Sequence, residues 1–140
     1  MPVRSRPDTS VLRAAPPFAR YDDRALAPLA RHADRLDLPA GVALARRGER
    51  AREAAVVVAG EAVAIGDGGV ARLGPGAWVG AREALVGAAH ATTVVAGDGL
   101  RVVVLPAPAL RWASQVLPGL LPPVAAREEP GAGARASRAA

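Results

Sequence analysis

The residues best suited to chemistry lie in one short segment, from Val79 to Ala96. It contains two glycines, the adjacent pair Arg82 and Glu83, two threonines, and a histidine at position 90. Arginine, histidine and backbone N–H groups can bind an anion, and a carboxylate can accept a hydrogen bond from a sugar hydroxyl. We therefore take this segment as the candidate ligand-binding site.

The rest of the chain shows no pattern typical of catalysis or metal binding. It has no cysteine, and its two histidines, His32 and His90, are far apart in the sequence. No Ser/His/Asp arrangement and no pair of catalytic carboxylates stands out. We expect His32 to be a solvated surface residue. We also expect no metal site and no enzymatic activity.

The charge of the chain gives little support for nucleic-acid binding. Its 18 basic residues are all arginine and face 13 acidic residues, which leaves a formal net charge of +5. No one-signed stripe forms, and aromatic residues for base stacking are scarce. The densest basic cluster spans residues 46–53 and is interrupted by two glutamates. We expect this cluster to be a solvated loop, with a partner-docking patch as the alternative.

Short strands must position the candidate site. Between residues 36 and 105, short apolar runs rich in valine alternate with turns that contain glycine. Branched side chains favour strands, and glycine turns at intervals of about 8 to 12 residues are typical of antiparallel sandwiches, rolls or barrels. The pattern predicts a mainly β fold.

Helical spacing is found only near the two ends of the β region. Apolar residues between Leu26 and Ala33 recur at i, i+3, i+4 and i+7, and an aspartate at position 22 or 23 could cap this helix. Pro28 predicts that the helix either begins near residue 27 or is kinked there. A second helix is expected over residues 109–117, before prolines that exclude a long continuation.

We expect one small domain over residues 16–124. The polar, arginine-rich residues 1–15 predict a flexible arm, and residues 125–140 predict a disordered tail because they lack large apolar side chains. No apolar run is typical of a signal peptide or a membrane span, so we expect a cytoplasmic protein.

Several turn motifs occur in an informative order. They are Pro17-Phe18, Pro39-Ala40-Gly41, Gly48-Glu49, the strand–glycine–strand unit from Val56 to Val63, and Leu73-Gly74-Pro75-Gly76. This order resembles the cyclic nucleotide-binding domain of the catabolite-activator type. The resemblance covers roughly residues 16–118. It implies an antiparallel β-roll or jelly-roll barrel flanked by short helices.

The resemblance also implies a role for the segment Val79 to Ala96. In that family a short helix and loop between two strands binds the ligand, through helix N–H groups and an arginine for the phosphate and a glutamate for the ribose. When the family pattern is aligned with this segment without a gap, Ala81 stands at the position of the glutamate and His90 at that of the arginine. Both ligand-defining side chains are therefore replaced.

The loss of these two contacts removes about 3–6 kcal/mol of binding free energy, which lowers the affinity roughly a hundred- to ten-thousandfold. Two alternatives could compensate for the replaced side chains. Arg82 or Glu83 could bind the ligand in a shifted register, and His90 could bind an anion as a neutral hydrogen-bond donor or as a cation. The other alternative is that His90 is a loop residue without a role in ligand binding. The candidate ligand-binding residues are Gly80, Ala81, Arg82, Glu83, His90, Ala91 and Thr92.

We therefore expect a regulatory domain that does not bind cyclic AMP in the usual way and acts as an interaction module. The alternative is a genuine sensor that binds a cyclic nucleotide or another small anion in this loop. We expect no cofactor unless the loop still binds a cyclic nucleotide. As a partner, we expect either another protein or a small anionic ligand. Because prolines follow Leu117, we expect neither the family's dimerisation helix nor its DNA-binding motif.

Overall fold

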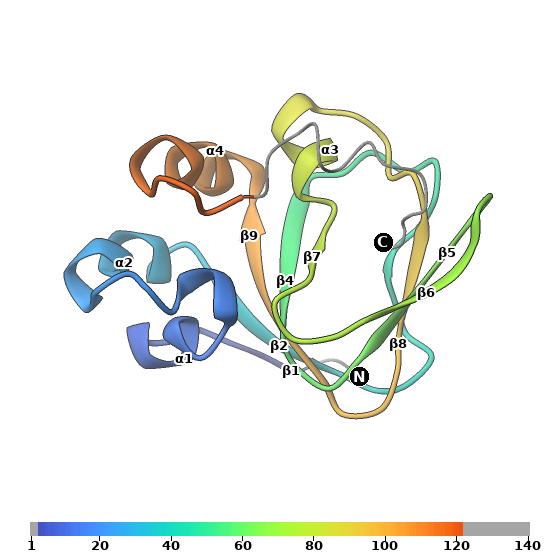
Figure 1. Ribbon diagram of the computed structural model, residues 1–140, viewed down its shortest axis with the longest axis horizontal. Coiled ribbons are helices and arrows are strands. Elements are labelled where there is room, and N and C mark those ends of the chain that lie inside the picture. The colour runs from blue at the N-terminus through green and yellow to red at the C-terminus, as the bar shows by residue number, and fades with distance from the viewer. Residues whose placement is uncertain (1–2, 122–140) are drawn as a thin grey trace.

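Two antiparallel sheets form the body of the structure, a computed structural model that describes residues 3–121 (Figure 1). The five-stranded sheet has the order β1 (Val3–Ser5), β2 (Asp34–Leu38), β9 (Leu100–Pro106), β4 (Glu53–Ala59) and β7 (Trp78–Val79). The four-stranded sheet has the order β3 (Ala43–Ala45), β8 (Thr93–Ala96), β5 (Ala62–Gly66) and β6 (Gly69–Leu73). The mainly β, antiparallel fold predicted from the sequence is confirmed.

Valine dominates the two central strands because both of their faces are buried. Val56 pairs with Val103 and Val57 with Val102, and all four side chains are fully buried. Since successive side chains of a strand point to opposite faces, Val56 and Val103 join a core beneath the helices. Val57 and Val102 join a second core inside the roll. Strands buried on both faces carry continuous apolar runs rather than an alternating pattern.

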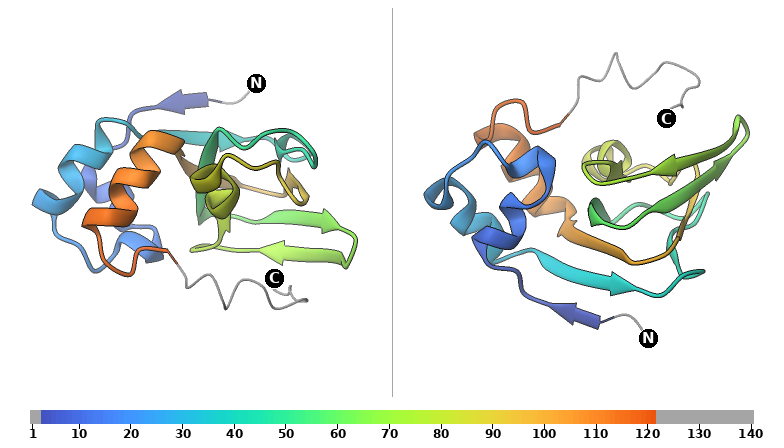
Figure 2. Two further views of the ribbon diagram at one scale, coloured as in Figure 1. Left: turned by 90° about the horizontal axis from the view of Figure 1, so that it is seen from above. Right: turned by 60° about the horizontal axis from the view of Figure 1, so that its bottom comes forward.

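The helices other than α3 lie at one end of the molecule, against the five-stranded sheet (Figure 2). They are α1 (Thr9–Arg13), the 3-10 turn Pro16–Phe18, α2 (Asp23–Ala30) and α4 (Ala107–Val116). Phe18 and Leu110 are fully buried in the core beneath them. The ring of Phe18 meets that of Trp78 edge-on, with 5.9 Å between centroids. This contact ties the helical layer to β7.

Helix α2 begins earlier than one of the two predicted alternatives. Asp22 is its N-cap, and the Asp22 carboxylate accepts a hydrogen bond from the Ala25 N–H at 2.8 Å. The helix therefore runs from Asp23 through Pro28, and a start near residue 27 is wrong. The predicted apolar face is buried, with Leu26 and Leu29 in the core. The free energy gained by burying this face exceeds the cost of the one helical hydrogen bond that Pro28, which has no N–H, cannot form.

Residues 3–15 contain a strand and a short helix, in a region where the composition predicted a flexible arm over residues 1–15. Strand β1 pairs with β2, so that Arg4 lies opposite Leu36. Asp8 caps α1 by accepting a hydrogen bond from the Val11 N–H at 3.0 Å, and Leu12 is fully buried. The polar composition gave no indication of strand β1 or of the burial of Leu12. The tail predicted for residues 125–140 lies outside the described residues.

None of the helices over residues 3–121 combines the length and the apolar character needed to cross a membrane.

Candidate functional site

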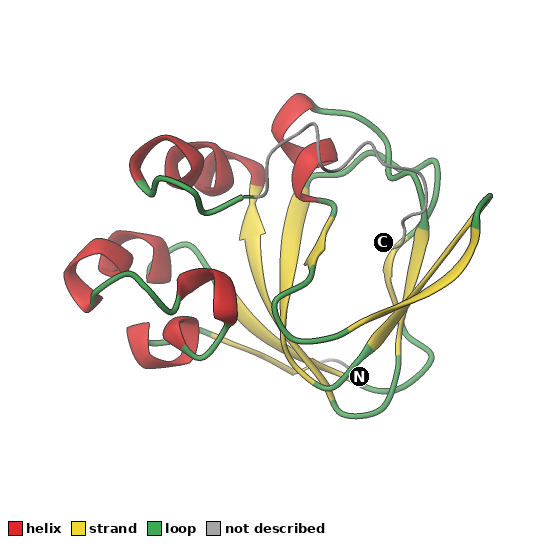
Figure 3. Ribbon diagram, viewed as in Figure 1, coloured by secondary structure: helices red, strands yellow, loops and turns green. Residues whose placement is uncertain are grey.

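The candidate segment runs from the end of β7 through α3 (Ala81–Val86) and a loop into β8. Figure 3 shows α3 apart from α1 and α2, beside the ends of the strands, and α3 contacts α4. A glycine with a left-handed backbone stands at each end of α3: Gly80 and Gly87 both have φ of 72°. Such values are strained for other residues, so the two predicted glycines fix where α3 begins and ends.

Gly80 is required for a second, steric reason. A Cβ atom on Gly80 would lie 2.7 Å from Cε1 and 3.2 Å from Nδ1 of His90. The imidazole therefore covers the start of α3, in the space that any larger residue at position 80 would fill. The structure thus brings together two of the predicted site residues, one that precedes α3 in the sequence and one that follows it.

Ala81 contributes packing rather than polar chemistry. Its side chain is 2% exposed and belongs to the core beneath the helices, as does that of Ala84 one turn later. The position at which the family resemblance implies a ribose-binding carboxylate is thus occupied by a small apolar side chain. Nothing at this position can accept a hydrogen bond from a ligand through its side chain.

Glu83 turns toward the loop that follows α3. Its Oε2 accepts a hydrogen bond from the Ala91 N–H at 3.4 Å. The neighbouring Arg82 is half-buried. The predicted residues Glu83 and Ala91 therefore meet each other, and the carboxylate contacts the very backbone amide that follows His90.

Thr92 lies away from the start of α3. A Cβ atom on Gly66 would be 2.9 Å from Cγ2 of Thr92, so this methyl group packs against β5. Thr93, which was not among the predicted site residues, instead accepts a hydrogen bond from the Arg47 N–H through Oγ1 at 3.1 Å. Successive side chains of an extended chain point to opposite sides, so Thr92 and Thr93 contact different parts of the fold.

The loop bearing His90 is fastened to the segment that contains the basic cluster. The His90 N–H donates to the Glu49 carbonyl at 2.8 Å, and the Gly48 N–H donates to the His90 carbonyl at 3.0 Å. The Ala51 N–H donates to the Ala88 carbonyl at 2.9 Å. The backbone of residues 88–90 is therefore held by residues 48–51, which are distant in the sequence.

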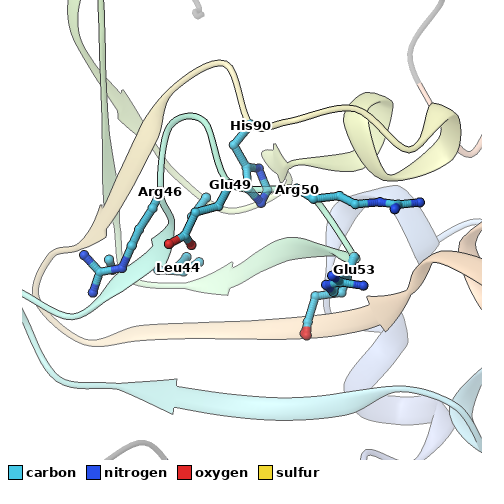
Figure 4. A pocket seen from close by; sticks show the side chains of 9 residues that line it. Leu44, Arg46, Glu49, Arg50, Glu53 and His90 are labelled. Atoms are coloured by element: carbon cyan, nitrogen blue, oxygen red, sulfur yellow. The ribbon is translucent and has the colours of Figure 1, made fainter.

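A cavity of about 510 Å³ lies between this basic segment and His90 (Figure 4). Figure 4 shows the side chains of His90 and Glu49 beside the same space, with Arg46 to one side and Glu53 to the other. Its lining residues are Ala43, Leu44, Ala45, Arg46, Glu49, Arg50, Arg52, Glu53 and His90. Of the predicted site residues, only His90 lines it.

The charged lining of this cavity was not predicted as part of the site. The sequence showed the basic cluster over residues 46–53 but gave no sign that it pairs with residues 88–90. Three arginines and two glutamates contribute to the lining, so the cavity presents both signs of charge. Such a lining offers hydrogen-bond donors and acceptors to a polar ligand.

Arg47 points away from the cavity and fastens the basic segment to the β5–β6 turn. Its guanidinium donates two hydrogen bonds to the Asp67 carboxylate, at 2.6 and 2.8 Å. This bidentate contact lowers the pKa of Asp67 below its ordinary value and raises that of Arg47. Both side chains are exposed, so solvent and salt screen the pair.

Over residues 3–121, no group of three or more His, Asp or Glu side chains is placed to hold a metal ion.

Comparisons with known proteins point to one family. The family described as "Cyclic nucleotide-binding domain" matches residues 35–115, more than half of the chain. A cyclic nucleotide-binding domain from Methylobacillus flagellatus KT is similar at 19% identity and a TM-score of 0.69, over 85% of this chain and 74% of that one. At this identity the likeness shows the fold.

Two further structures are similar at higher identity. A cyclic nucleotide-binding-like protein from Brucella abortus is 28% identical with a TM-score of 0.59, over 77% of this chain and 97% of that one. A cAMP-binding acyltransferase from Mycobacterium smegmatis is 27% identical with a TM-score of 0.66, over 81% of this chain and 36% of that one. Among curated protein sequences, a search finds no match.

Proposed function

Because this chain belongs to the cyclic nucleotide-binding domain family, we propose that it is a regulatory domain that does not bind cyclic AMP in the family's usual way and acts as an interaction module. Domains of this family are generally regulatory rather than catalytic. The observation that carries the proposal is the contact of His90 with Gly80. At the position expected for a phosphate-binding arginine, a shorter side chain lies against the start of α3.

The chemistry of an imidazole differs from that of a guanidinium. Arginine carries a permanent positive charge and five N–H donors in a planar fork, whereas a neutral histidine has one donor. Ala81 supplies no carboxylate for a ribose hydroxyl. With both contacts absent, a micromolar affinity for cyclic AMP falls to about the millimolar range.

Exposed apolar side chains support the role of an interaction module. Ile65 and Val70 face each other across the β5–β6 hairpin, and they are 45% and 70% exposed. Figure 1 shows this hairpin reaching outward from the body of the roll. Exposed apolar residues that lie together are typical of protein-binding surfaces.

Thermal melting with cyclic AMP tests the proposal. A ligand at a hundred times its dissociation constant stabilises a protein by about 2.7 kcal/mol, which raises Tm by about 10 °C for a domain of this size. We expect no more than about 2 °C at 1 mM cyclic AMP, with AMP at the same concentration as the control. A saturable rise of several degrees that is specific to cyclic AMP would overturn the proposal.

A second candidate function is supported by the cavity beside His90. Its volume of about 510 Å³ lies in the range of small-molecule sites, and its lining offers donors and acceptors. The chain would then be a sensor of a small polar ligand other than cyclic AMP. Melting against a metabolite panel tests this role: a compound that stabilises the protein but not a His90→Ala variant favours the sensor over the interaction module.

A further inference from the structure

We infer that Glu83 determines which ligands the loop after α3 accepts, because its carboxylate occupies the N–H of Ala91, one of the predicted ligand-binding residues. The inference deepens the proposed function and rests on it. It identifies an acidic residue that excludes phosphate-bearing ligands, in addition to the missing arginine and glutamate. The contact that carries it joins Oε2 of Glu83 to the Ala91 N–H at 3.4 Å.

The backbone around Glu83 holds its side chain in reach of Ala91. The Glu83 carbonyl accepts hydrogen bonds from the N–H groups of Gly87 and Ala88, the latter at 2.9 Å. Gly87 then turns the chain through a left-handed conformation, so that the loop passes back along α3. Glu83 and Ala91 are eight residues apart, and this reversal makes their contact possible.

The Ala91 N–H differs from two of its neighbours in the kind of partner it has. Ala88 and His90 donate their N–H groups to backbone carbonyls of Glu83 and Glu49. Those partners are fixed by the fold. The partner of Ala91 is a flexible side chain that is only half-buried, so it can move when the solution or the ligand changes. Ala91 is therefore the amide at which a ligand would compete.

The competition is unequal for an anion. A phosphate approaching the Ala91 N–H must first displace a carboxylate and then remain close to its negative charge. Like charges about 4 Å apart repel appreciably even near a protein surface. A neutral ligand meets no such repulsion. Glu83 therefore disfavours an anion at the Ala91 N–H independently of the residue at position 90.

The direct test compares Glu83→Gln with Glu61→Gln in the full chain. Both variants remove one negative charge, and Glu61 lies in the β5–β6 region, where it pairs with Arg72 at 3.6 Å. The probe is inorganic phosphate, followed at the Ala91 amide by NMR of the ¹⁵N-labelled protein. We expect Glu83→Gln to bind phosphate at this amide at least about tenfold more tightly than Glu61→Gln.

A second measurement needs no ligand. Hydrogen exchange at the Ala91 amide should be at least about threefold faster in Glu83→Ala than in Glu61→Ala, because only the former loses the acceptor. If exchange at Ala91 is equal in these variants, or if both Gln variants respond equally to phosphate, the inference is wrong.

The failure of this inference and that of the proposed function are separable. Specific binding of cyclic AMP by the unmodified chain would contradict the proposed function. Equal phosphate responses in the two Gln variants, with no cyclic AMP binding by the unmodified chain, would leave the proposed function intact and remove Glu83 from the account.

Discussion

The His90 imidazole lies against Gly80 so closely that a Cβ atom on Gly80 would be 2.7 Å from Cε1 of the ring. The two residues flank α3 in the sequence, and their contact brings the loop that follows α3 back to its N-cap residue. Because the His90 backbone is also bonded to Glu49 and Gly48, both the ring and the main chain at this position are held in place. The contact is the basis of the first prediction.

Gly80→Ala should destabilise the domain by about 1–3 kcal/mol, through its positive φ and its clash with His90. Chemical denaturation measures the change. Gly68→Ala is the matched control, since a Cβ atom there meets nothing within 4 Å and its φ lies outside the left-handed region. Adding His90→Ala to Gly80→Ala should recover part of the loss. Equal stability of the two glycine variants would contradict the described contact.

Ala81→Glu should cost several kcal/mol, because it places a carboxylate in the core beneath the helices. Val86→Glu, at an exposed position of the same helix, should cost far less. Melting temperatures of the two variants check this. A harmless Ala81→Glu would mean that a carboxylate at position 81 can reach solvent or a ligand, and cyclic AMP binding should then be measured in combination with His90→Arg.

Leu12→Ala should destabilise the chain by about 2–5 kcal/mol, since Leu12 is fully buried. Val11 is half-buried, and Val11→Ala serves as the control. Denaturant unfolding of both variants decides whether α1 belongs to the folded domain. A loss for Leu12→Ala no larger than that for Val11→Ala would favour the flexible arm that the composition suggested.

Asp37→Asn should reduce stability at neutral pH by an amount that disappears in acid. Asp37 and Arg101 lie opposite each other on β2 and β9, with Oδ1 and Nε 2.8 Å apart. The hydrogen bond from Arg101 lowers the pKa of Asp37 in the folded state. Its contribution is therefore present above the unfolded pKa and is lost as the pH falls through the folded pKa.

Melting curves across the acid range measure this convergence. The effect should be small and should shrink further in high salt, because both side chains are substantially exposed. A difference between the variant and the original chain that persists unchanged at low pH would contradict the assignment to the Arg101 contact.

The fold was largely predictable because its elements are local and repetitive. The valine run at the centre of β4 indicated a strand, and turns such as Gly74-Pro75-Gly76 indicated where strands end. The proposed exchange of the family's two ligand residues for Ala81 and His90 also came from the sequence, since it needed only the spacing from Gly80. These inferences depend on residues within one segment.

The contacts that shape the site join segments distant in the sequence, and no local pattern encodes them. His90 bonds to Glu49 through the main chain, which any residue type could do. The hydrogen bond from Ala91 to Glu83 depends on the left-handed turn at Gly87. Likewise, the burial of Leu12 depends on helices that follow it. Predicting these features requires the register of the sheets.

The central claim is that this chain retains the family fold without the usual response to cyclic AMP. Isothermal titration calorimetry of the full chain with cyclic AMP, with AMP as the reference, tests it most directly. We predict no saturable heat that is specific to cyclic AMP up to about 1 mM, in keeping with the lost contacts. Saturable binding in the micromolar range would contradict the claim and would show that His90 and the backbone amides alone suffice.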